Sequence, residues 1–412
     1  MYDPTIHRST LNRQFQRRDF QADKRLYNAD YRSSIVDNAL VRAKQGLDGV
    51  QLIKTTRRGK KIYQIKNLPD ALLIRLIRNN IRRVTSVKQT DRGHIVDCIA
   101  EMLAQGLPFR AYKFDIKSFY ETVDIEHITR RLSADIAFSG PSLQVLKGFF
   151  ASISEDGISG LPRGMSISAT LSEYVMRSFD RFVTAHPSVW YYSRFVDDMI
   201  IITSGKEKPR QFVAALKRSL PTGLRFNQKS RFYNFKDYQK GTPEIVENSI
   251  DFLGYSFHVS NAQHDKINNR LYRNIRIDIS ERKVSKIKTK LCLALVDFNK
   301  TGDFETLRNR IRLVTSNFMY IDKSTGRRRP SGIFYNYPKV VAATSQSLVK
   351  LDRFLAAVLS SPHPKNRLRP SLSQSQQQEL LRLTFASGFA KKRFFHFSPA
   401  TLAKLTRCWT HA

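Results

Sequence analysis

Two adjacent carboxylates, Asp197 and Asp198, stand between two apolar runs in the segment 190–203. Aromatic and β-branched residues on both sides of a short polar break predict a hairpin with a two-residue turn. Such a turn places both acids at its tip, where their mutual repulsion is costly unless a cation lies nearby. Aspartates also occupy turns that have no chemical role, and the pair taken alone fits either interpretation.

A third carboxylate, Asp115, ends the alternating run 109–115, which is typical of a strand. Carboxylates at two strand ends suit nucleotidyl transfer, in which two Mg²⁺ ions roughly 3.5–4 Å apart activate an attacking hydroxyl and stabilise the leaving pyrophosphate. Mg²⁺ selects hard oxygen ligands, which explains aspartate in place of His or Cys. The plain alternative is an exposed aspartate that only ends a strand.

Hydrophobic spacing outlines the elements that must position these acids. We expect helices over 68–81, 95–103 and 167–183, a basic loop over 82–92 and a Gly/Pro-rich loop over 158–164. Residues 1–64 carry 14 Lys and Arg against 6 Asp and Glu. We interpret them as a basic N-terminal extension with short helices around 31–45 and a hairpin formed by 50–53 and 61–65.

The last part of the chain, 263–412, is more basic still, with 29 Lys and Arg against 9 Asp and Glu. Apolar residues between Val284 and Phe298 recur at helical intervals, which predicts an amphipathic helix. Its other side carries Lys283, Lys286, Lys288 and Lys290. Loops are expected at 327–330 and 362–370 and a polar tract at 371–378. We therefore expect a basic helical domain.

Composition limits the classes of partner. The chain has 412 residues, 41% of them hydrophobic, and a formal charge of +35, so it can bury a core shared by two or three domains. This charge favours a polyanion as the binding partner. Nucleic acid is favoured over a membrane surface because neither an apolar run of roughly 18 residues nor a lipidation signal is present. Cys98, Cys292 and Cys408 lack metal-ligand spacing, and the polar N-terminus lacks a secretory signal, so we expect a cytoplasmic protein.

Five segments resemble, in order, motifs A to E of reverse transcriptases. They are Phe114-Asp115-Ile-Lys-Ser-Phe-Tyr120 (A), Gly160-Leu-Pro-Arg-Gly164-Met-Ser-Ile-Ser168 (B), Phe195-Val-Asp-Asp198 (C), Gly223-Leu-Arg-Phe-Asn-Gln-Lys229 (D) and Asp251-Phe-Leu-Gly254-Tyr (E). Each motif is weak or moderate alone, and the ordered set is specific. The resemblance implies an α+β right-hand polymerase with a ferredoxin-like palm, mixed fingers and a helical thumb. Fingers and palm would occupy 65–262, and the thumb would occupy 263–412.

The resemblance also implies roles for residues that match position by position. Asp115 and Asp197 would bridge two Mg²⁺ ions, and Asp198 would support the site. Ile116 would offer its backbone carbonyl to a metal. Lys229 matches the motif D lysine that is proposed to protonate the leaving pyrophosphate, with a solvated surface lysine as the alternative.

Further roles concern the substrate. Tyr120 matches the aromatic gate that stacks under the sugar and excludes a 2′-hydroxyl; the alternative is a core aromatic, since its neighbour Phe119 would point the opposite way in a strand. Pro162 and Gly164 match the loop that packs against the nascent base pair and the template. Retroviral and intron enzymes usually have Gln where this chain has Arg163, a cation that could contact phosphate or the template backbone.

Two assignments concern the primer and the triphosphate. Leu253 and Gly254 match the primer-grip hairpin. Lys88 and Arg92 are expected to hold the triphosphate because their segment is basic and precedes motif A. Arg82 and Arg83 compete for that role.

Several stretches look more specifically like bacterial antiviral reverse transcriptases of the unknown group. They are 163–168, 171–174, 192–198, 332–338 and 391–397. The similarity is greatest to the smaller reverse transcriptase of type 3 defence-associated systems. We expect no RNase H or integrase domain after the thumb, which weighs against a retroviral or mobile-intron enzyme.

This resemblance implies an RNA-directed DNA polymerase that copies a noncoding RNA in antiviral defence. The implied partners are template RNA, DNA product, dNTPs and a second reverse transcriptase, in a possible higher-order oligomer and without a membrane. The alternatives are a retron-type enzyme, although the Asn-Ala-x-x-His signature is absent, and a non-templated or protein-primed DNA polymerase of the abortive-infection type. An RNA-directed RNA polymerase is disfavoured by Tyr120, and a nucleic-acid-binding scaffold with a dead site is disfavoured by the three intact aspartates.

Overall fold

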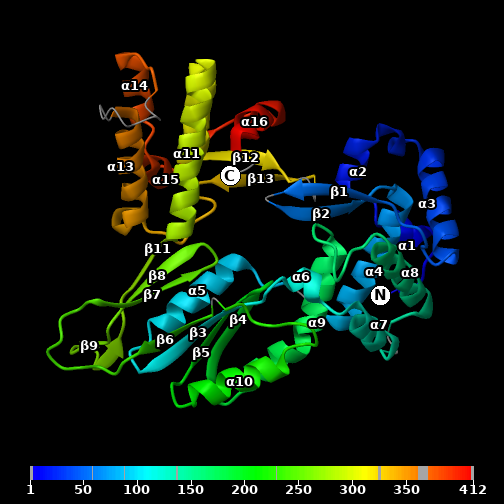
Figure 1. The fold of residues 1–412 in the computed structure, drawn as a ribbon, viewed down its shortest axis with the longest axis horizontal. Coiled ribbons are helices and arrows are strands. Elements are labelled where there is room, and N and C mark those ends of the chain that lie inside the picture. The colour runs from blue at the N-terminus through cyan, green and yellow to red at the C-terminus, as the bar shows by residue number, and fades with distance from the viewer. Residues whose placement is uncertain are drawn as a thin grey trace. The chain divides into compact units, whose positions relative to one another are not determined.

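The computed structural model describes residues 3–409 apart from 58, 88, 136–137, 229, 323–325 and 361–369. The chain is a mixed α/β protein with two compact units (Figure 1). The first unit comprises Met1–Arg92 and Pro108–Asn234, and the second comprises Gly93–Leu107 and Phe235–Ala412.

The first unit is organised around a four-stranded sheet with the order β4-β5-β3-β6. Its strands are β3 (Phe109–Asp115), β4 (Val189–Phe195), β5 (Asp198–Thr203) and β6 (Arg231–Phe235). The chain passes from β3 to β4 through α6 (Phe119–Thr122), α7 (Ile125–Ser133), α8 (Gly140–Glu155) and α9 (Ser166–Thr184), and from β5 to β6 through α10 (Pro209–Ser219). This β-α-β-β-α-β connectivity and strand order are those of the ferredoxin-like arrangement.

Strand β5 lies between β3 and β4 and is buried from Met199 to Thr203. A central strand that is covered on both faces needs a continuous apolar run, and Met-Ile-Ile-Ile supplies it. The predicted strand 109–115 coincides with β3, and the predicted strand–turn–strand over 189–203 is confirmed by β4 and β5.

Helix α4 (Leu68–Thr85) packs the predicted apolar stripe into the core of this unit. Pro69 stands in its first turn, where its missing N–H is of no consequence. The helix continues to Thr85 and ends at Ser86, which has a φ of 54°. Arg82 and Arg83 therefore lie in the last helical turn and not in a loop as predicted, a position where cations are favoured by the helix dipole.

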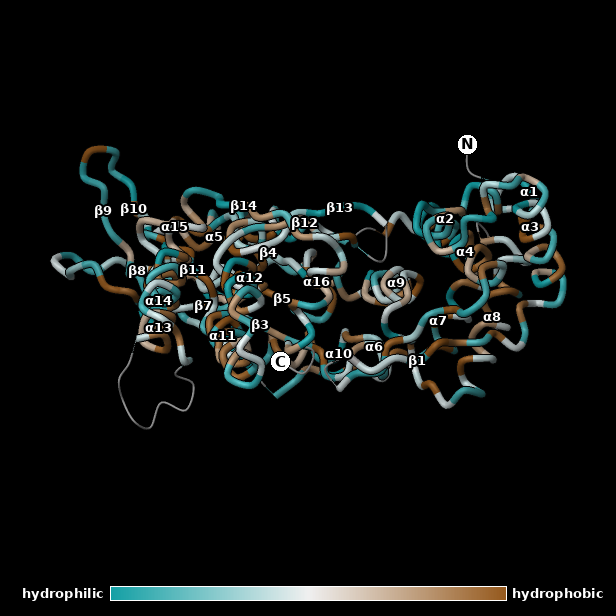
Figure 2. The backbone as a smooth tube through the Cα atoms, turned by 90° about the horizontal axis from the view of Figure 1, so that it is seen from above, coloured by the Kyte–Doolittle hydropathy of each residue, from teal (hydrophilic) through white to brown (hydrophobic). Residues whose placement is uncertain are grey.

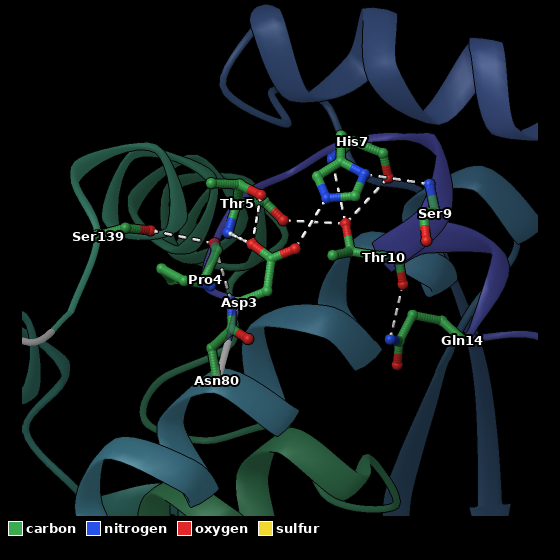
Figure 3. A network of polar contacts seen from close by, with 9 residues as sticks. All are labelled: Asp3, Pro4, Thr5, His7, Ser9, Thr10, Gln14, Asn80 and Ser139. Atoms are coloured by element: carbon green, nitrogen blue, oxygen red, sulfur yellow. Dashed lines mark hydrogen bonds and ion pairs between the residues drawn. The ribbon is translucent and has the colours of Figure 1, made fainter. Parts of the chain in front are cut away.

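The N-terminal extension is packed into the first unit. Its elements are α1 (Arg8–Asn12), α2 (Arg17–Ala22), η1 (Lys24–Tyr27), α3 (Ala29–Lys44), β1 (Leu52–Arg57) and β2 (Lys60–Ile65). Asn80 of α4 and Ser139 both donate to the carbonyl oxygen of Pro4, at 3.3 and 3.4 Å (Figure 3). The buried Arg75 donates to both oxygens of Asp19, at 2.5 and 2.8 Å. A polar sequence thus joins the fold through specific hydrogen bonds.

The second unit begins with α5 (Arg92–Leu103), most of which belongs to it, and then contains two small sheets. One has the order β11-β8-β7, built from β7 (Val246–Phe252), β8 (Tyr255–Ser260) and β11 (Ile275–Ile279). The other is the hairpin of β9 (Gln263–Asp265) and β10 (Arg270–Tyr272), whose strands are largely hydrophilic (Figure 2).

The remainder of the second unit is helical except for a third sheet. The helices are α11 (Glu281–Thr301), α12 (Phe304–Thr315), η2 (Ala342–Thr344), α13 (Gln346–Ser360), α14 (Gln374–Leu381), α15 (Phe385–Ala390), α16 (Pro399–Thr406) and η3 (Arg407–Trp409). The predicted amphipathic helix is confirmed by α11, in which Val284, Leu291 and Phe298 are buried. The sheet has the order β13-β12-β14, with β12 (Asn317–Ile321), β13 (Arg328–Gly332) and β14 (Phe394–Phe395).

This third sheet corrects the prediction of a purely helical C-terminal domain. The Arg-Arg-Pro-Ser-Gly segment predicted as a loop is the edge strand β13, which pairs antiparallel with β12. An edge strand needs no buried face and tolerates Pro330, so its sequence lacks the alternation by which strands are identified. Part of the predicted polar tract forms α14, and the loop predicted at 362–370 lies almost wholly outside the described residues. Within the described part of the chain, no helix is both long and apolar enough to cross a membrane.

Candidate active site

The three predicted carboxylates meet at one end of the four-stranded sheet. Asp115 is the last residue of β3 and lies directly opposite Asp198, the first residue of β5. Asp197 occupies the two-residue turn between β4 and β5, in which Phe195 pairs with Asp198. The register thus brings together two aspartates on neighbouring strands and a third on the adjoining turn.

Backbone contacts hold the turn that carries Asp197. The N–H of Ile116 donates to the carbonyl oxygen of Asp197 at 3.2 Å, which ties the turn to the end of β3. Val196 has a φ of 63°, a left-handed conformation that a β-branched residue rarely adopts. Arg194 donates to the carbonyl oxygen of Val196 at 3.0 Å. A strained residue next to a functional side chain persists only where such contacts hold it.

The charge of Asp115 acts on the carboxyl group of Asp197. Burial raises the pKa of Asp197, and repulsion from Asp115 raises it further. The cations of Arg163 and Lys60 oppose this shift. A bound cation would remove the repulsion between the two acids, because an opposite charge within a few ångströms favours ionised carboxylates.

Asn227 is a site residue that the sequence analysis missed. Its side-chain amide donates to the carboxylate of Asp115 at 3.0 Å, and its backbone N–H donates to the Asp115 carbonyl oxygen at 2.6 Å. It belongs to the motif D segment, in which only Lys229 was singled out. Lys229 itself lies outside the described residues. The carboxylate orientation of Asp115 is thus set from the segment that precedes β6.

The donor set at this sheet end suits Mg²⁺. It consists of the carboxylates of Asp115, Asp197 and Asp198 and nearby backbone carbonyls, all of them hard oxygen ligands. Among the residues that the structure describes, no three His, Cys, Asp or Glu side chains converge to enclose an ion by themselves. Mg²⁺ commonly takes one or two carboxylates and fills its remaining positions with water and substrate phosphates, so an open arrangement fits an ion that arrives with a nucleotide.

Tyr120 lies beside this site on the short helix α6, not on a strand as expected. Its ring is half-buried and is covered by the Arg163 guanidinium, 5.1 Å from the ring centroid. Burial raises the pKa of the Tyr120 hydroxyl, while a hydrogen bond with Ser172 lowers it. Phe119 is fully buried in the core, so it cannot take the place of Tyr120 as a surface that faces the substrate.

The Gly/Pro-rich loop is fixed against the β1–β2 hairpin. The N–H of Tyr63 donates to the Arg163 carbonyl oxygen at 2.8 Å, and the Arg163 guanidinium donates to Glu121 at 2.8 Å. The Ser168 hydroxyl donates to the Pro162 carbonyl oxygen at 2.7 Å. Gly164 has a φ of 92°, and a Cβ atom there would lie 2.3 Å from the Ile62 side chain. Only glycine allows this close approach.

Four cations are candidates for the triphosphate, and the structure describes three of them, Arg82, Arg83 and Arg92. Lys88 lies outside the described residues, and Arg92 is the first residue of α5. Arg82 and Arg83 line a pocket of about 450 Å³ together with Asn79, Ser86 and Val87. Lys60 of β2, by contrast, acts electrostatically on both Asp197 and Glu121. The prediction missed it because Lys60 belongs to the N-terminal extension, far from the motifs in sequence.

The turn predicted as primer grip joins β7 and β8 in the second unit. Leu253 and Gly254 have φ values of 48° and 85°, between the paired residues Phe252 and Tyr255. Two positive φ values define a type I′ turn, which matches the twist of a hairpin. The N–H of Ser280 donates to the Gly254 carbonyl oxygen at 3.1 Å, which connects the turn to the start of α11. Its role at a primer stays a prediction.

Replacing Tyr120 with Val should raise the incorporation of rNTPs relative to dNTPs. The substitution removes the half-buried ring that would contact a 2′-hydroxyl. We expect a shift of about 10- to 200-fold, the range over which a pocket discriminates one small group. Competition between matched rNTP and dNTP measures the ratio. Tyr120→Phe keeps the ring and should keep the wild-type ratio, and an unchanged ratio in Tyr120→Val would make Tyr120 a core residue.

Carboxylates at the ends of neighbouring strands are the kind of ligand set that two-metal nucleotidyl transfer uses. Residues 65–257 match the family described as "Reverse transcriptase (RNA-dependent DNA polymerase)". The matched part spans just under half of the chain. The activity that the family's description names, RNA-dependent DNA polymerase, is the enzyme class predicted from the sequence.

Three solved telomerase structures from yeasts are also similar to this chain at 12% identity. Apo telomerase from Candida tropicalis truncated from its C-terminal domain has a TM-score of 0.34, and the match covers 55% of this chain and 55% of that one. For apo telomerase from Candida tropicalis the TM-score is 0.36, with 92% and 69% covered. For telomerase from Candida albicans in complex with a TWJ fragment of telomeric RNA the TM-score is 0.32, with 82% and 54% covered. TM-scores this low establish no common fold. No curated protein matches the chain.

Proposed function

We propose that the whole chain is a reverse transcriptase that copies a noncoding RNA template into DNA in bacterial antiviral defence. The observation that carries the polymerase part is the placement of Asp115 opposite Asp198, with Asp197 on the adjoining turn, inside the segment that matches the reverse transcriptase family. The defence part is supported by the resemblance of the motif segments and of 332–338 and 391–397.

In this proposal Asp115 and Asp197 hold two Mg²⁺ ions, Asp198 supports them, and Ile116 offers its carbonyl oxygen. When bound, the ions supply Lewis-acid activation of the primer hydroxyl and neutralise the leaving pyrophosphate. Asn227 is a positioning residue that keeps the Asp115 carboxylate oriented through its 3.0 Å hydrogen bond. Arg194 and Val196 hold the turn on which Asp197 stands.

The incoming dNTP would lie between the carboxylates and the Gly/Pro-rich loop. Tyr120 would face the sugar, and Pro162 and Gly164 would contact the nascent pair. Lys60 and Arg163 are the cations that act on Asp197, so we assign them to the triphosphate in preference to Lys88 and Arg92. Release of Arg163 from Glu121 would free its guanidinium for phosphate.

These assignments divide the chain into the palm, fingers and thumb of a right-hand polymerase. The four-stranded sheet would be the palm, α4 would contribute to the fingers, and 263–412 would be the thumb, with Leu253 and Gly254 as primer grip. Residues 1–64 would form the extension that braces the fingers. The proposed partners are template RNA, DNA product, dNTPs and a second reverse transcriptase in a higher-order assembly.

Sequencing the RNA that copurifies with the protein, and the DNA that it makes from dNTPs and Mg²⁺, tests the proposal. We expect one abundant noncoding RNA and a DNA product complementary to part of it. DNA without any complement in the bound RNA would contradict templated synthesis. DNA attached covalently to the protein would instead identify the protein-primed alternative, and a branched RNA–DNA product would identify the retron-type one.

The basic face of α11 supports a role in gripping a duplex, although its lysines are not simply solvated. Lys288 lies over the Phe354 ring at 5.1 Å, and Lys290 lies over the Trp409 ring at 5.3 Å. The ammonium groups rest on the faces of aromatic rings, and such cation–π contacts order the two side chains. These lysines are therefore held in place before any nucleic acid binds.

Changing Lys283, Lys286, Lys288 and Lys290 together to Gln should weaken binding to primer–template of any sequence. Each lost phosphate contact should flatten the dependence of log affinity on log salt by about 0.7–0.9, because fewer counterions are released. Titrations at several salt concentrations measure the slope. The charge-matched control changes the exposed Lys206, Lys208, Lys217 and Lys240 to Gln. An equal effect in both variants would mean that net charge alone is responsible and that α11 has no specific role.

A further inference from the structure

Five aromatic rings form a continuous series around β13 and β14 in the second unit. We call this series the aromatic strip: Phe389, Phe334, Tyr335, Phe394 and His396. Successive centroids are 5.3, 5.4, 6.5 and 5.1 Å apart. The strip begins at the buried Phe389 and ends at exposed rings, since Tyr335 is 42% exposed and His396 is also exposed. The polymerase chemistry proposed above does not use these residues.

One buried side chain fixes the two segments that carry the strip. Asn317, 1% exposed, accepts hydrogen bonds from the N–H groups of Phe334 and Tyr335 at 3.0 and 3.5 Å. Its amide nitrogen donates to the Arg393 carbonyl oxygen at 2.9 Å, immediately before Phe394. The exposed rings are thus preorganised, and a ligand that stacks on them loses little free energy in ordering them.

A cation borders the strip, and acids are nearly absent from its segments. Lys392 lies 4.6 Å above the Phe334 ring. Arg328 is exposed farther along the hydrophilic edge strand β13, four residues before its end at Gly332 (Figure 2). Asp322 is the sole acidic residue in 317–340 and 384–397, and it is paired with Arg329 at 3.1 Å. Exposed rings and a neighbouring cation are the two elements of a surface that binds unpaired nucleic acid.

The opposite face of the same sheet provides a comparison. Register pairs Phe318 with Phe395 and Asn317 with Phe394, so Phe395 lies on the face opposite to Phe394. Tyr320 alternates with Phe318 and shares that opposite face, and it is 38% exposed. There Phe395 is covered by the Arg312 guanidinium at 5.1 Å. An aromatic of similar exposure therefore exists on a face that lacks the strip.

We propose that the aromatic strip binds an unpaired stretch of nucleic acid. Bases stack on Tyr335 and His396, and Lys392 contacts a phosphate. Stacking is tolerant of sequence because every base offers a π-face, so the site takes single-stranded RNA or DNA of any composition. The two sources in this enzyme are an unpaired part of a bound RNA and the newly made DNA strand.

The test measures binding of the full chain to fluorescent oligouridylate and oligothymidylate, with EDTA present to prevent polymerisation. Tyr335→Ala should raise the Kd about 5- to 150-fold, which corresponds to the loss of one base stack of about 1–3 kcal/mol. Tyr335→Phe keeps the ring and should bind like wild type. Tyr320→Ala on the opposite face is the matched control and should also bind like wild type. Thermal unfolding of each variant checks that the fold is retained.

If Tyr335→Ala loses affinity for both oligonucleotides, the strip stacks bases without a preference for either sugar. A loss of affinity for oligouridylate alone points to the bound RNA as the ligand. A loss of affinity for oligothymidylate alone points to the product DNA strand. Unchanged Kd values for Tyr335→Ala, or an equal loss in Tyr320→Ala, overturn the proposal. Photo-cross-linking with a 4-thiouridine oligonucleotide should label peptides that contain 334–335 or 394–396, and labels found solely elsewhere also overturn it. Extension of a preannealed primer–template should proceed at the wild-type rate in Tyr335→Ala, so failure of this site and failure of the polymerase proposal are distinguishable.

Discussion

Replacing Asp197 with Asn should lower the rate of dNTP incorporation by about 10³-fold or more. The carboxylate on the β4–β5 turn is the proposed ligand for both metal ions, and stabilisation of the transition-state charge by such ions contributes several kcal/mol. Single-turnover primer extension at saturating Mg²⁺ and dNTP measures the chemical step. Asp48→Asn, an exposed aspartate in the same unit, removes the same charge and should leave the rate unchanged.

The same variant should not lose stability. The pKa of Asp197 is raised by burial and by Asp115, so the folded state binds a proton more readily than the unfolded state does. The free energy of unfolding therefore falls as the pH rises from the pKa of Asp197 in the unfolded chain through its pKa in the folded protein. At neutral pH the metal-free protein has lost the whole of this contribution to its stability. Asp197→Asn removes the ionisable carboxyl group, and its melting temperature should equal or exceed that of wild type at neutral pH. Near wild-type polymerisation in this variant would contradict the assignment of the site.

Replacing Arg194 with Met should lower the free energy of unfolding by about 3–5 kcal/mol, the loss typical when one partner of a buried ion pair is removed. The Arg194 side chain is 5% exposed and donates to Glu173 at 2.6 Å and to Asp180 at 2.7 Å. Burial acts to lower the pKa of Arg194, but the hydrogen bond and charge of Asp180 and the charge of Glu173 raise it above its usual value. Without the guanidinium, two carboxylates on α9 lose their cation.

Denaturant unfolding monitored by circular dichroism measures this effect. Arg8→Met is the matched control, because Arg8 is 61% exposed where it pairs with Asp37, and exposed pairs contribute about 0–1 kcal/mol. Arg194 also donates to the carbonyl oxygen of Val196, so the variant should slow polymerisation through a looser turn even under conditions where it is folded. An unfolding free energy equal to that of Arg8→Met would show that Glu173 and Asp180 find other partners or take up protons.

The polypeptide sequence by itself determined the elements that carry the candidate site. Strand β3, the β4–β5 hairpin and the helices α4, α9 and α11 were predicted at or near their observed bounds. Each has a strong hydrophobic period and a clear break at its end, and these are local properties of the chain. The three aspartates could be located because they stand at those breaks.

Only the tertiary structure decided which distant residues complete the site. Asn227 reaches Asp115 from the segment before β6, and Lys60 acts on Asp197 from the N-terminal extension. Neither contact has a local signature in the sequence. The residues around a lysine or a loop asparagine do not show whether its side chain faces a carboxylate. The three-dimensional register of the strands, which depends on packing over the whole unit, brings them together.

Dependence on distant partners also explains the elements that the sequence analysis predicted wrongly. Tyr120 belongs to a short helix, because Phe119 beside it turns into the core and the chain leaves the sheet directly after Asp115. Strand β13 forms from a basic segment with no apolar alternation, because β12 supplies its hydrogen-bond partners. Strand β14 pairs with β12 in parallel across a long stretch of chain. Local propensity indicates where a buried element begins and ends, whereas edge strands and polar contacts depend on a partner that only the folded chain provides.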